Sequence, residues 1–514
     1  MNQRTFRTLL VTLTLSAAPA LAQPAKPLPD RPAPVTPAPA LAGAAAPRPV
    51  VDEAAAVLAP QPGGLTSAQV ADRTSANSTS VQQRLAEVDI ARARVAQTTA
   101  QFFPTLTFRA SYTRLSAVNS GLGSGSLVGA LHPGQLTVGP CPQGQCVLDS
   151  QGQPVAAQAF EIGTVENNYA LTATLNVPLS DYVLRLSNAA AGSSANRRSA
   201  ELQVKAERLK VRADAQALFY EWLRALARVA IAEKSLERTR ARLKDAGPAF
   251  ELGTITRADV MRLEALQAST EQVLIEARSF RDLTERQLAI LMNEEPGSGY
   301  RVGEDIGVPL APLPGRMDAL TTRALRTRLE LRALHEAARS ARLGARAVRA
   351  GVLPRVDAFG DVTYANPNQR YFPPQERWRA TWSVGVAATW TVGDAFNNSA
   401  QARELEANAR ALAAQREALA DGIRQEVAQQ YLARAQGDAA LFSAEREVAA
   451  SQEAYRVAID LYRVGRATTT EVIEAETDLL AARLNHVNAR LQKRIAEVRL
   501  RHAVGHDIPP ERAQ

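Results

Sequence analysis

Four segments of the chain alternate apolar with polar residues, which is the two-residue period of a strand with one apolar face. The most regular segment places Trp382, Val384 and Val386 between serine, glycine and alanine. The four strands are expected at about 105–115, 169–178, 355–364 and 380–392. Their apolar residues, which we predict to face lipid, are Leu106, Phe108, Tyr112, Tyr169, Leu171, Leu175, Val356, Val362, Trp382, Val384, Val386 and Trp390.

Strands of about 8 to 11 residues can cross the hydrocarbon layer of a membrane when they are tilted. A soluble antiparallel sheet with one face on a core has the same alternation, so this pattern alone leaves both interpretations open. Tyrosine and tryptophan near the strand ends favour the membrane, because their rings prefer its interface. Four strands cannot close a barrel and lipid does not tolerate an open edge, so a membrane-spanning sheet requires several chains.

Between the strand pairs, the sequence predicts helices much longer than those of ordinary globular proteins. Residues 183–246 lack proline and would measure on the order of 96 Å as one helix. Their apolar residues are spaced alternately by four and three, as in a coiled-coil seam: Val211, Ala215, Leu218, Trp222, Ala225, Val229, Ala232 and Leu236. We expect a second long helix at about 395–460, and shorter helices at 66–102, 258–292, 317–350 and 470–503.

The order of these elements occurs twice with similar spacing. Asp181 and Gly253 are 72 residues apart (253 − 181), and Asp394 and Gly465 are 71 apart (465 − 394). The extra length of the first copy lies between its two strands, in residues 116–168, where a surface loop can absorb it. We therefore predict an internal two-fold repeat, with one copy at 66–314, another at 315–508 and a tail at 509–514.

The first 22 residues have the features of a signal peptide, namely basic Arg4 and Arg7, a short apolar run and small residues before a cleavage site after Ala22. Residues 23–65 are rich in proline and alanine and are expected to be flexible. The net charge of +8 is spread along the chain, which argues against nucleic acid as a partner. No later stretch approaches the ~18 continuous apolar residues of a membrane helix.

The sequence contains no nucleophile elbow, phosphate-binding loop or metal-ligand cluster. We therefore expect no enzyme activity, no cofactor and no metal. The two cysteines, Cys141 and Cys146, lie five residues apart in the long first loop. In an exported chain a disulfide between them is the expected state.

Two glycine turns, at Gly253 and Gly465, each precede a predicted helix. Each of these helices has an acid three residues after a threonine, Asp259 in the first and Glu471 in the second. This spacing is that of a capping box, in which the acid satisfies a backbone amide at the helix start. Such a local role does not exclude a second role for either acid.

In their order and spacing these motifs resemble the outer-membrane efflux proteins of the TolC type, over roughly residues 66–508. The most specific piece is the segment 461–465 (LYRVG) followed by 471–475 (EVIEA). Pro104 and Pro354 before strands, and the step from strand to helix at 177–181 (VPLSD), add to the resemblance.

The resemblance implies an α+β membrane protein with a long coiled-coil α-helical barrel and a transmembrane β-barrel. Three identical chains would each give four strands to one twelve-stranded barrel. Such a homotrimer is a passive exit duct of a tripartite efflux or type I secretion system, in the outer membrane of a Gram-negative bacterium. Its implied partners are a periplasmic adaptor protein, an inner-membrane pump of the resistance-nodulation-division or ATP-binding-cassette type, and outer-membrane lipid.

By the same resemblance, Glu471 and Glu474 match acids that ring the periplasmic constriction of the family. Three chains would bring six carboxylates together there, an arrangement that favours cations. The candidates for contacts that hold the tip closed are Asp259, Tyr462, Arg463 and Arg466, the two arginines being rivals for one position.

A soluble periplasmic coiled-coil scaffold with small sheet insertions is the alternative function. It retains the helices but leaves the apolar strand faces and the signal peptide without a common explanation. The transported substrate and the class of inner-membrane transporter stay open at this point.

Overall fold

The computed structural model describes residues 56–505 apart from 117–125, 131, 133, 143, 160–164, 296, 298, 313–314 and 373. The expected signal peptide, the expected tail and most of the proline-rich segment lie outside the described residues. Near the end of that segment, Leu58 and Leu65 are buried, and Leu65 forms a parallel β-bridge with Val302. The expectation of flexibility up to residue 65 is therefore wrong for this end, because two leucines supply apolar contacts there.

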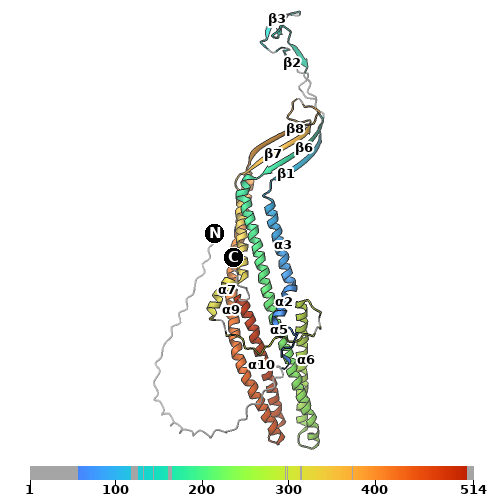
Figure 1. Cartoon of the computed structure of the whole chain (residues 1–514), viewed down its shortest axis with the longest axis vertical. Coiled ribbons are helices and arrows are strands. Elements are labelled where there is room, and N and C mark those ends of the chain that lie inside the picture. The colour runs from blue at the N-terminus through green and yellow to red at the C-terminus, as the bar shows by residue number, and fades with distance from the viewer. Residues whose placement is uncertain are drawn as a thin grey trace, which may run out of the picture. The chain divides into compact units, whose positions relative to one another are not determined.

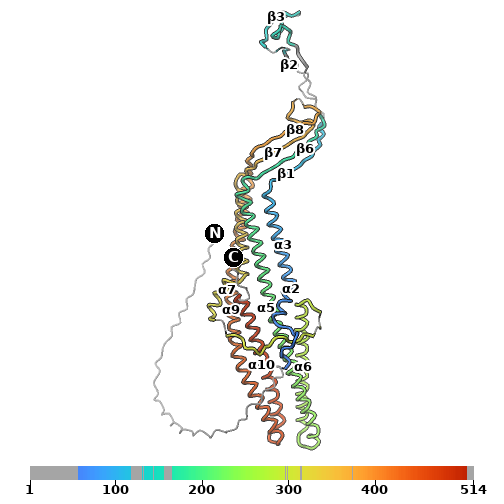
Figure 2. Tube along the Cα trace, in the orientation of Figure 1, coloured from blue at the N-terminus to red at the C-terminus, as the bar shows by residue number. Residues whose placement is uncertain are grey.

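Helices dominate the described chain and run side by side, with a four-stranded sheet at one end and two hairpin turns at the other (Figure 1, Figure 2). The long helices α5 (Ser187–Glu251) and α9 (Val392–Arg463) have 65 and 72 residues, or roughly 98 and 108 Å. Each turns back into a shorter helix, α6 (Arg257–Met292) or α10 (Thr469–Val504). Further helices pack on the long ones: α2 (Ser67–Asn77), α3 (Thr79–Ala100), α7 (Met317–Thr327) and α8 (Leu329–Ala350).

The largest hydrophobic core lies along the middle of α5. Phe219, Trp222 and Leu223 are fully buried there, in one cluster with Leu491 and Ile495 of α10. Much of the remaining buried surface of α5 consists of alanine, which lets neighbouring helices approach closely. Helix α5 thus has neighbours on more than one side, as the two apolar sides of its sequence predict.

Two helices that the sequence predicts as continuous are each broken once. The segment 66–102 forms α2 and α3 around Ser78, whose hydroxyl oxygen accepts a bond from the backbone amide of Val81 at 3.5 Å. The segment 317–350 forms α7 and α8 around Arg328, which has an extended backbone. The Arg328 guanidinium is buried and pairs with Glu330 and Glu426 at 3.1 and 3.0 Å. The distant partner Glu426 helps to stabilise a break that local sequence does not reveal.

Helix α5 also begins and ends differently from its expected range of 183–246. A short turn, α4 (Leu179–Asp181), and a π-helical turn, η1 (Tyr182–Leu186), precede it. At its other end the helix continues through Pro248 to Glu251. A single proline removes only one backbone hydrogen bond, and here just one more turn follows before the hairpin.

The sheet is antiparallel throughout, with the strand order β1 (Thr105–Arg114), β6 (Asn167–Val177), β7 (Arg355–Asn366) and β8 (Arg379–Thr389). Its register aligns the apolar residues of all four strands on one face, as in the row Phe108, Ala173, Val362 and Trp382. The next row, on the opposite face, is Thr107, Thr174, Asp361 and Ser383. The sheet therefore has one apolar face and one polar face.

The long loop between β1 and β6 contains strands that the sequence analysis missed. Strands β2 (Ser126–Gly129) and β5 (Ala156–Ala159) form one pair, and β3 (Thr137–Cys141) and β4 (Gly144–Leu148) form another. These strands are short and rich in glycine and small residues, so they lack the alternation that marks the longer four.

Candidate functional site at the hairpin tips

Each hairpin turn depends on a glycine with a left-handed backbone. Gly253 has a φ of +70° and Gly465 a φ of +71°, which other residues adopt only at a cost. The amide of Thr254 donates to the Ala249 carbonyl at 2.9 Å, and that of Arg466 donates to the Leu461 carbonyl at 2.8 Å. These bonds satisfy carbonyls at the end of the long helices and fix both turns in the same geometry.

The predicted capping boxes are confirmed at both tips. The Thr256 amide donates to the Asp259 carboxylate at 3.0 Å, and the Thr468 amide donates to the Glu471 carboxylate at 2.7 Å. At Asp259, hydrogen bonds from the side chain and the amide of Thr256 hold the pKa of the carboxyl below its ordinary value. Both acids therefore serve the local role that the sequence predicts.

One turn further along, the two tips differ in charge. Arg262 lies one turn beyond Asp259, 3.3 Å from its carboxylate, and its Nη1 also donates to the Thr470 hydroxyl at 3.0 Å. The second hairpin has Glu474 at the corresponding place, and this side chain is exposed. Arg262 thus connects the start of α6 to the start of α10 within one chain, while Glu471 and Glu474 leave an acidic surface on the second tip.

The other predicted tip-closing residues make only local contacts. Tyr462 is half-buried, and its carbonyl accepts the Gly465 amide at 3.0 Å. Arg463 lies 3.7 Å from Asp460 on its own helix, and Arg466 is exposed. Within the described part of the chain, no side-chain hydrogen bond or ion pair joins any of these three to Asp259.

A buried ionic cluster above the tips escaped the sequence analysis. Glu476 of α10 is only 2% exposed. Its carboxylate oxygens lie 3.6 Å from the Arg238 Nε and 2.5 Å from the Arg242 Nη1, both on α5. Arg242 also donates to the Tyr455 hydroxyl on α9 and lies over its ring, 5.4 Å from the centroid. Three helices from both hairpins therefore meet at one carboxylate.

This cluster has electrostatic consequences for the groups in it. Burial, followed by the negative charge of Glu476, raises the pKa of Tyr455 above its ordinary value. A buried carboxylate is costly unless it is paired, so Glu476 ties α10 to α5 for as long as it stays buried. The sequence contains a signal for it, because Glu476 continues the buried stripe of Thr469, Val472 and Leu479, where an apolar residue is expected.

The predicted lipid-facing residues lie at the end of the molecule opposite the hairpin tips, on the apolar face of the sheet. All of them except the half-buried Val356 are exposed. Aromatic rings gather near the loop end, where Tyr169 packs on Tyr112 and Trp378 with centroid distances of 4.9 and 6.1 Å. Trp390 lies near the helix end and donates to the Val352 carbonyl at 3.2 Å.

The remaining predictions concern a disulfide in the long loop, membrane-spanning helices and metal sites. Cys141 and Cys146 are joined by a disulfide across the β3–β4 hairpin. None of the helices within the described ranges is both long and apolar enough to cross a membrane. In the same residues, no group of three or more histidine, cysteine, aspartate or glutamate side chains is placed to hold a metal ion.

Comparisons with known proteins agree with this architecture. The sequence profile of the family described as outer membrane efflux protein matches residues 70–294 and 320–506. The outer membrane efflux protein BepC of Brucella suis biovar 1 (strain 1330) is 23% identical over 314 residues, which cover 60% of this chain and 67% of BepC.

Solved structures show the same fold. The Campylobacter jejuni CmeC outer membrane channel superimposes with a TM-score of 0.68 at 14% identity, covering 88% of this chain and 90% of CmeC. The CusC transmembrane channel protein also gives 0.68, at 16% identity, covering 85% of this chain and 92% of CusC.

Proposed function

Because this chain belongs to the outer membrane efflux protein family, we propose that it is a passive exit duct that conducts substrates from an inner-membrane transporter across the periplasm and the outer membrane. The family, and with it the TolC-type resemblance, is confirmed. It places the protein in the outer membrane of a Gram-negative bacterium, extending into the periplasm. A soluble periplasmic scaffold does not fit that location, and the proposed duct carries out no chemical step.

One observation carries this proposal, namely a sheet with an exposed apolar face and two free edges. Strands β1 and β8 are its edges, and each lacks a partner on one side among the described strands. Lipid can accept the apolar face but not the unpaired backbone groups of the edges. The sheet is therefore complete only when β1 of one chain pairs with β8 of another.

The family resemblance implies three chains, and the width that a duct needs is compatible with that number. Two chains would pool eight strands, and a barrel of about eight strands has an interior that side chains fill. Three chains would pool twelve, which leaves a passage lined by the polar face with Thr107, Asp361 and Ser383. We therefore propose a homotrimer with one twelve-stranded β-barrel, continued by an α-helical barrel in which the two halves of each chain are a repeat.

The spacing of aromatic rings on the sheet supports its insertion in a membrane. Tyr364 pairs with Ala380, which lies ten residues before Trp390 (390 − 380). Ten residues of strand span roughly 33 Å. With a tilt of ~40°, this distance becomes ~25 Å along the membrane normal, the height of the apolar band of outer-membrane barrels.

At the opposite end, we propose that the hairpin tips form the periplasmic constriction. Helices of roughly 100 Å carry the tips far from the sheet. Glu471 and Glu474 of three chains would form an acidic ring there. A periplasmic adaptor would bind around the tips and link the duct to an inner-membrane pump, which supplies the energy.

Paired substitutions on the two faces of β8 test the duct. Val384→Lys places a charge on the apolar face, which costs about 2 to 4 kcal/mol near the bilayer centre and should prevent recovery in outer membranes. Ser383→Lys, on the opposite face, should insert and reduce cation conductance in planar bilayers. Equal recovery of both variants, or an unchanged pore for Ser383→Lys, would contradict the proposed arrangement.

A further inference from the structure

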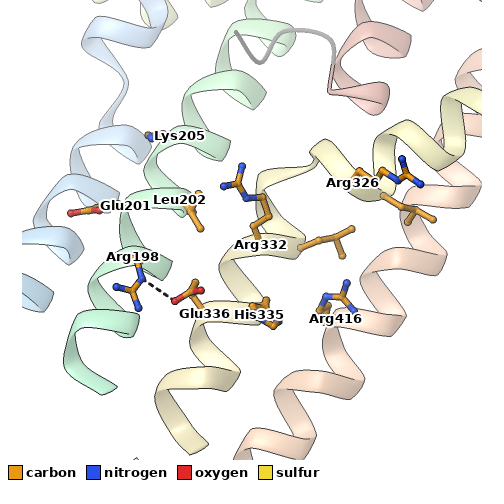
Figure 3. A pocket seen from close by; sticks show the side chains of 11 residues that line it. Arg198, Glu201, Leu202, Lys205, Arg326, Arg332, His335, Glu336 and Arg416 are labelled. Atoms are coloured by element: carbon orange, nitrogen blue, oxygen red, sulfur yellow. Dashed lines mark hydrogen bonds and ion pairs between the residues drawn. The ribbon is translucent and has the colours of Figure 1, made fainter. Parts of the chain in front are cut away.

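A groove of about 440 Å³ lies where α5, α7, α8 and α9 meet (Figure 3). Its floor is apolar, because Leu331 is buried and Leu202 and Leu325 are half-buried. Its rim is formed by long polar side chains from all four helices. The volume is that of a site for a small molecule or a short chain segment.

Positive charge dominates the rim. Five arginine or lysine side chains and only two glutamates line the groove, together with His335. Both acids are paired, since the Glu336 carboxylate accepts the Arg198 Nε at 3.1 Å and Glu201 lies 3.6 Å from Arg197. Arg416 is paired as well, with Glu417 at 2.6 Å. Lys205 and Arg326 make no ion pair within the described part of the chain, and both are exposed. The lining therefore keeps a net positive charge, to which Lys205 and Arg326 contribute without an ion pair of their own.

Figure 3 shows how the cations are arranged. Arg326, Arg332 and Arg416 come from α7, α8 and α9 and lie around one space. Gathering like charges costs free energy, which an anionic ligand would recover. Guanidinium groups bind carboxylates and phosphates through two parallel hydrogen bonds, so they favour ligands with such groups. The leucine floor favours a ligand whose anionic groups are joined by a carbon framework.

The position of the groove limits the source of its ligand, provided that the proposed duct is correct. Arg198 and Lys205 follow the first residue of α5 by 11 and 18 residues (counted from Ser187), or roughly 17 to 27 Å along the helix. A lipid headgroup layer is only about 5 to 8 Å thick, so the groove lies beyond it. Helix α7 packs on α9 and α10, and it would narrow the passage of the proposed duct if it lay inside, so we infer that the groove faces the periplasm.

We propose that this groove binds an acidic peptide segment of a periplasmic protein. Carboxylates of that segment bind Arg326 and Arg332, and its backbone packs over the leucine floor. The site would hold the helical barrel to an acidic periplasmic polypeptide at a fixed distance below the outer membrane. Such anchoring is independent of the opening of the tips.

Binding of a fluorescein-labelled tetraglutamate peptide to the full-length protein in detergent, followed by anisotropy, tests this proposal. The wild-type protein should bind the peptide at low ionic strength and release it as salt is added. Arg326→Gln combined with Arg332→Gln should weaken binding by about tenfold or more, because two charge-assisted contacts are lost. The matched control is Arg342→Gln with Arg346→Gln, which removes two exposed arginines of α8 outside the groove.

Unchanged affinity in the control and loss in the groove variant would support the proposal. Absence of peptide binding, or equal loss in both variants, would overturn it. Binding of phosphatidylglycerol vesicles without peptide binding would assign the groove to lipid and would also overturn it. Bilayer conductance of the same preparation reports separately on the duct, so a failure of the proposed function is distinguishable from a failure of this site.

Discussion

The α5–α6 and α9–α10 hairpins end in turns with nearly the same geometry and unlike surfaces. Both turns have a glycine with φ near +70° and a threonine cap that pairs with an acid three residues on. Beyond the cap, the first tip carries Arg262 and the second Glu474. The first tip is thus linked through Arg262 to Thr470, whereas the acids of the second stay exposed.

The comparison of the two tips distinguishes residues that any helical hairpin requires from residues that only a duct would use. A glycine turn and a capping box are required wherever a long helix reverses, so their presence at both tips follows from folding alone. Opposite charges one turn further are not required by the turn. We propose that they mark different tasks for the hairpins, with the first as a support and the second as the acidic constriction.

Removal of the Glu476 carboxylate, which joins the two hairpins, should have the largest effect on the stability of the protein. Glu476→Gln leaves Arg238 and Arg242 without their buried partner, which should destabilise the packing of the hairpins by about 3 kcal/mol. We expect a lower midpoint of thermal loss of helical circular dichroism and a higher resting conductance. Glu474→Gln is the control, because the same change on an exposed side chain should leave the midpoint nearly unchanged. Equal midpoints for the two variants would show that the Glu476 cluster does not stabilise the packing of the hairpins.

Neutralising the second tip should change ion selectivity without changing stability. In the double variant Glu471→Gln with Glu474→Gln, the preference for potassium over chloride in planar bilayers should fall by at least about threefold. Glu264→Gln makes the same kind of change on the exposed surface of α6 and should leave selectivity unaltered. Unchanged selectivity in the double variant would exclude an acidic ring at the constriction.

Loss of single tip contacts should have a smaller effect on the closed state. Asp259→Asn weakens the contact with Arg262 and should raise resting conductance by about twofold to tenfold, since one such contact contributes roughly 0.5 to 1.5 kcal/mol. Tyr462→Phe removes no hydrogen bond within the described chain, so a similar rise in this variant would reveal a contact of the hydroxyl with a neighbouring chain. Single-channel recording of each variant measures this change. A duct that stays shut without Asp259 would limit this residue to its capping role.

The stability of the first tip should depend slightly on pH. The pKa of Asp259 is lowered in the folded protein, so its contribution to stability is fully present above the unfolded pKa of about 3.9. That contribution is lost as pH falls through the folded value. Below about pH 4 the wild-type tip should therefore loosen more than that of Asp259→Asn. Hydrogen exchange of residues 256–262 measures it, and identical acid profiles would contradict the assignment.

Local pattern was sufficient to predict the elements whose stability is local. The four long strands alternate apolar with polar residues, apart from Phe359 on the polar face, and the register then places Phe108, Val362 and Trp382 on one face. The glycine turns and caps likewise depend on residues within one turn of each other. The π-helical start of α5 and the short loop strands were missed because no comparable pattern marks them.

Features that depend on distant partners were missed. The break at Arg328 is stabilised by Glu426, far along the chain, and Glu476 is paired with Arg238 and Arg242 of the other hairpin. In a helix with many polar residues, a single acid such as Glu476 is taken for a surface residue unless its position among the buried residues of the helix is recognised. Sequence reasoning therefore named the exposed Glu471 and Glu474 but not the buried acid next to them.

A reversible link between the hairpins tests the central claim, that contacts between the two hairpins of one chain keep the tip closed. Arg262→Cys and Thr470→Cys place thiols where the two side chains now meet, and a bifunctional methanethiosulfonate reagent joins them. In the Glu476→Gln background, the account predicts that cross-linking returns bilayer conductance to the closed level and that reduction restores it, while single-cysteine variants are unaffected. Full cross-linking with an open conductance that persists would contradict the account.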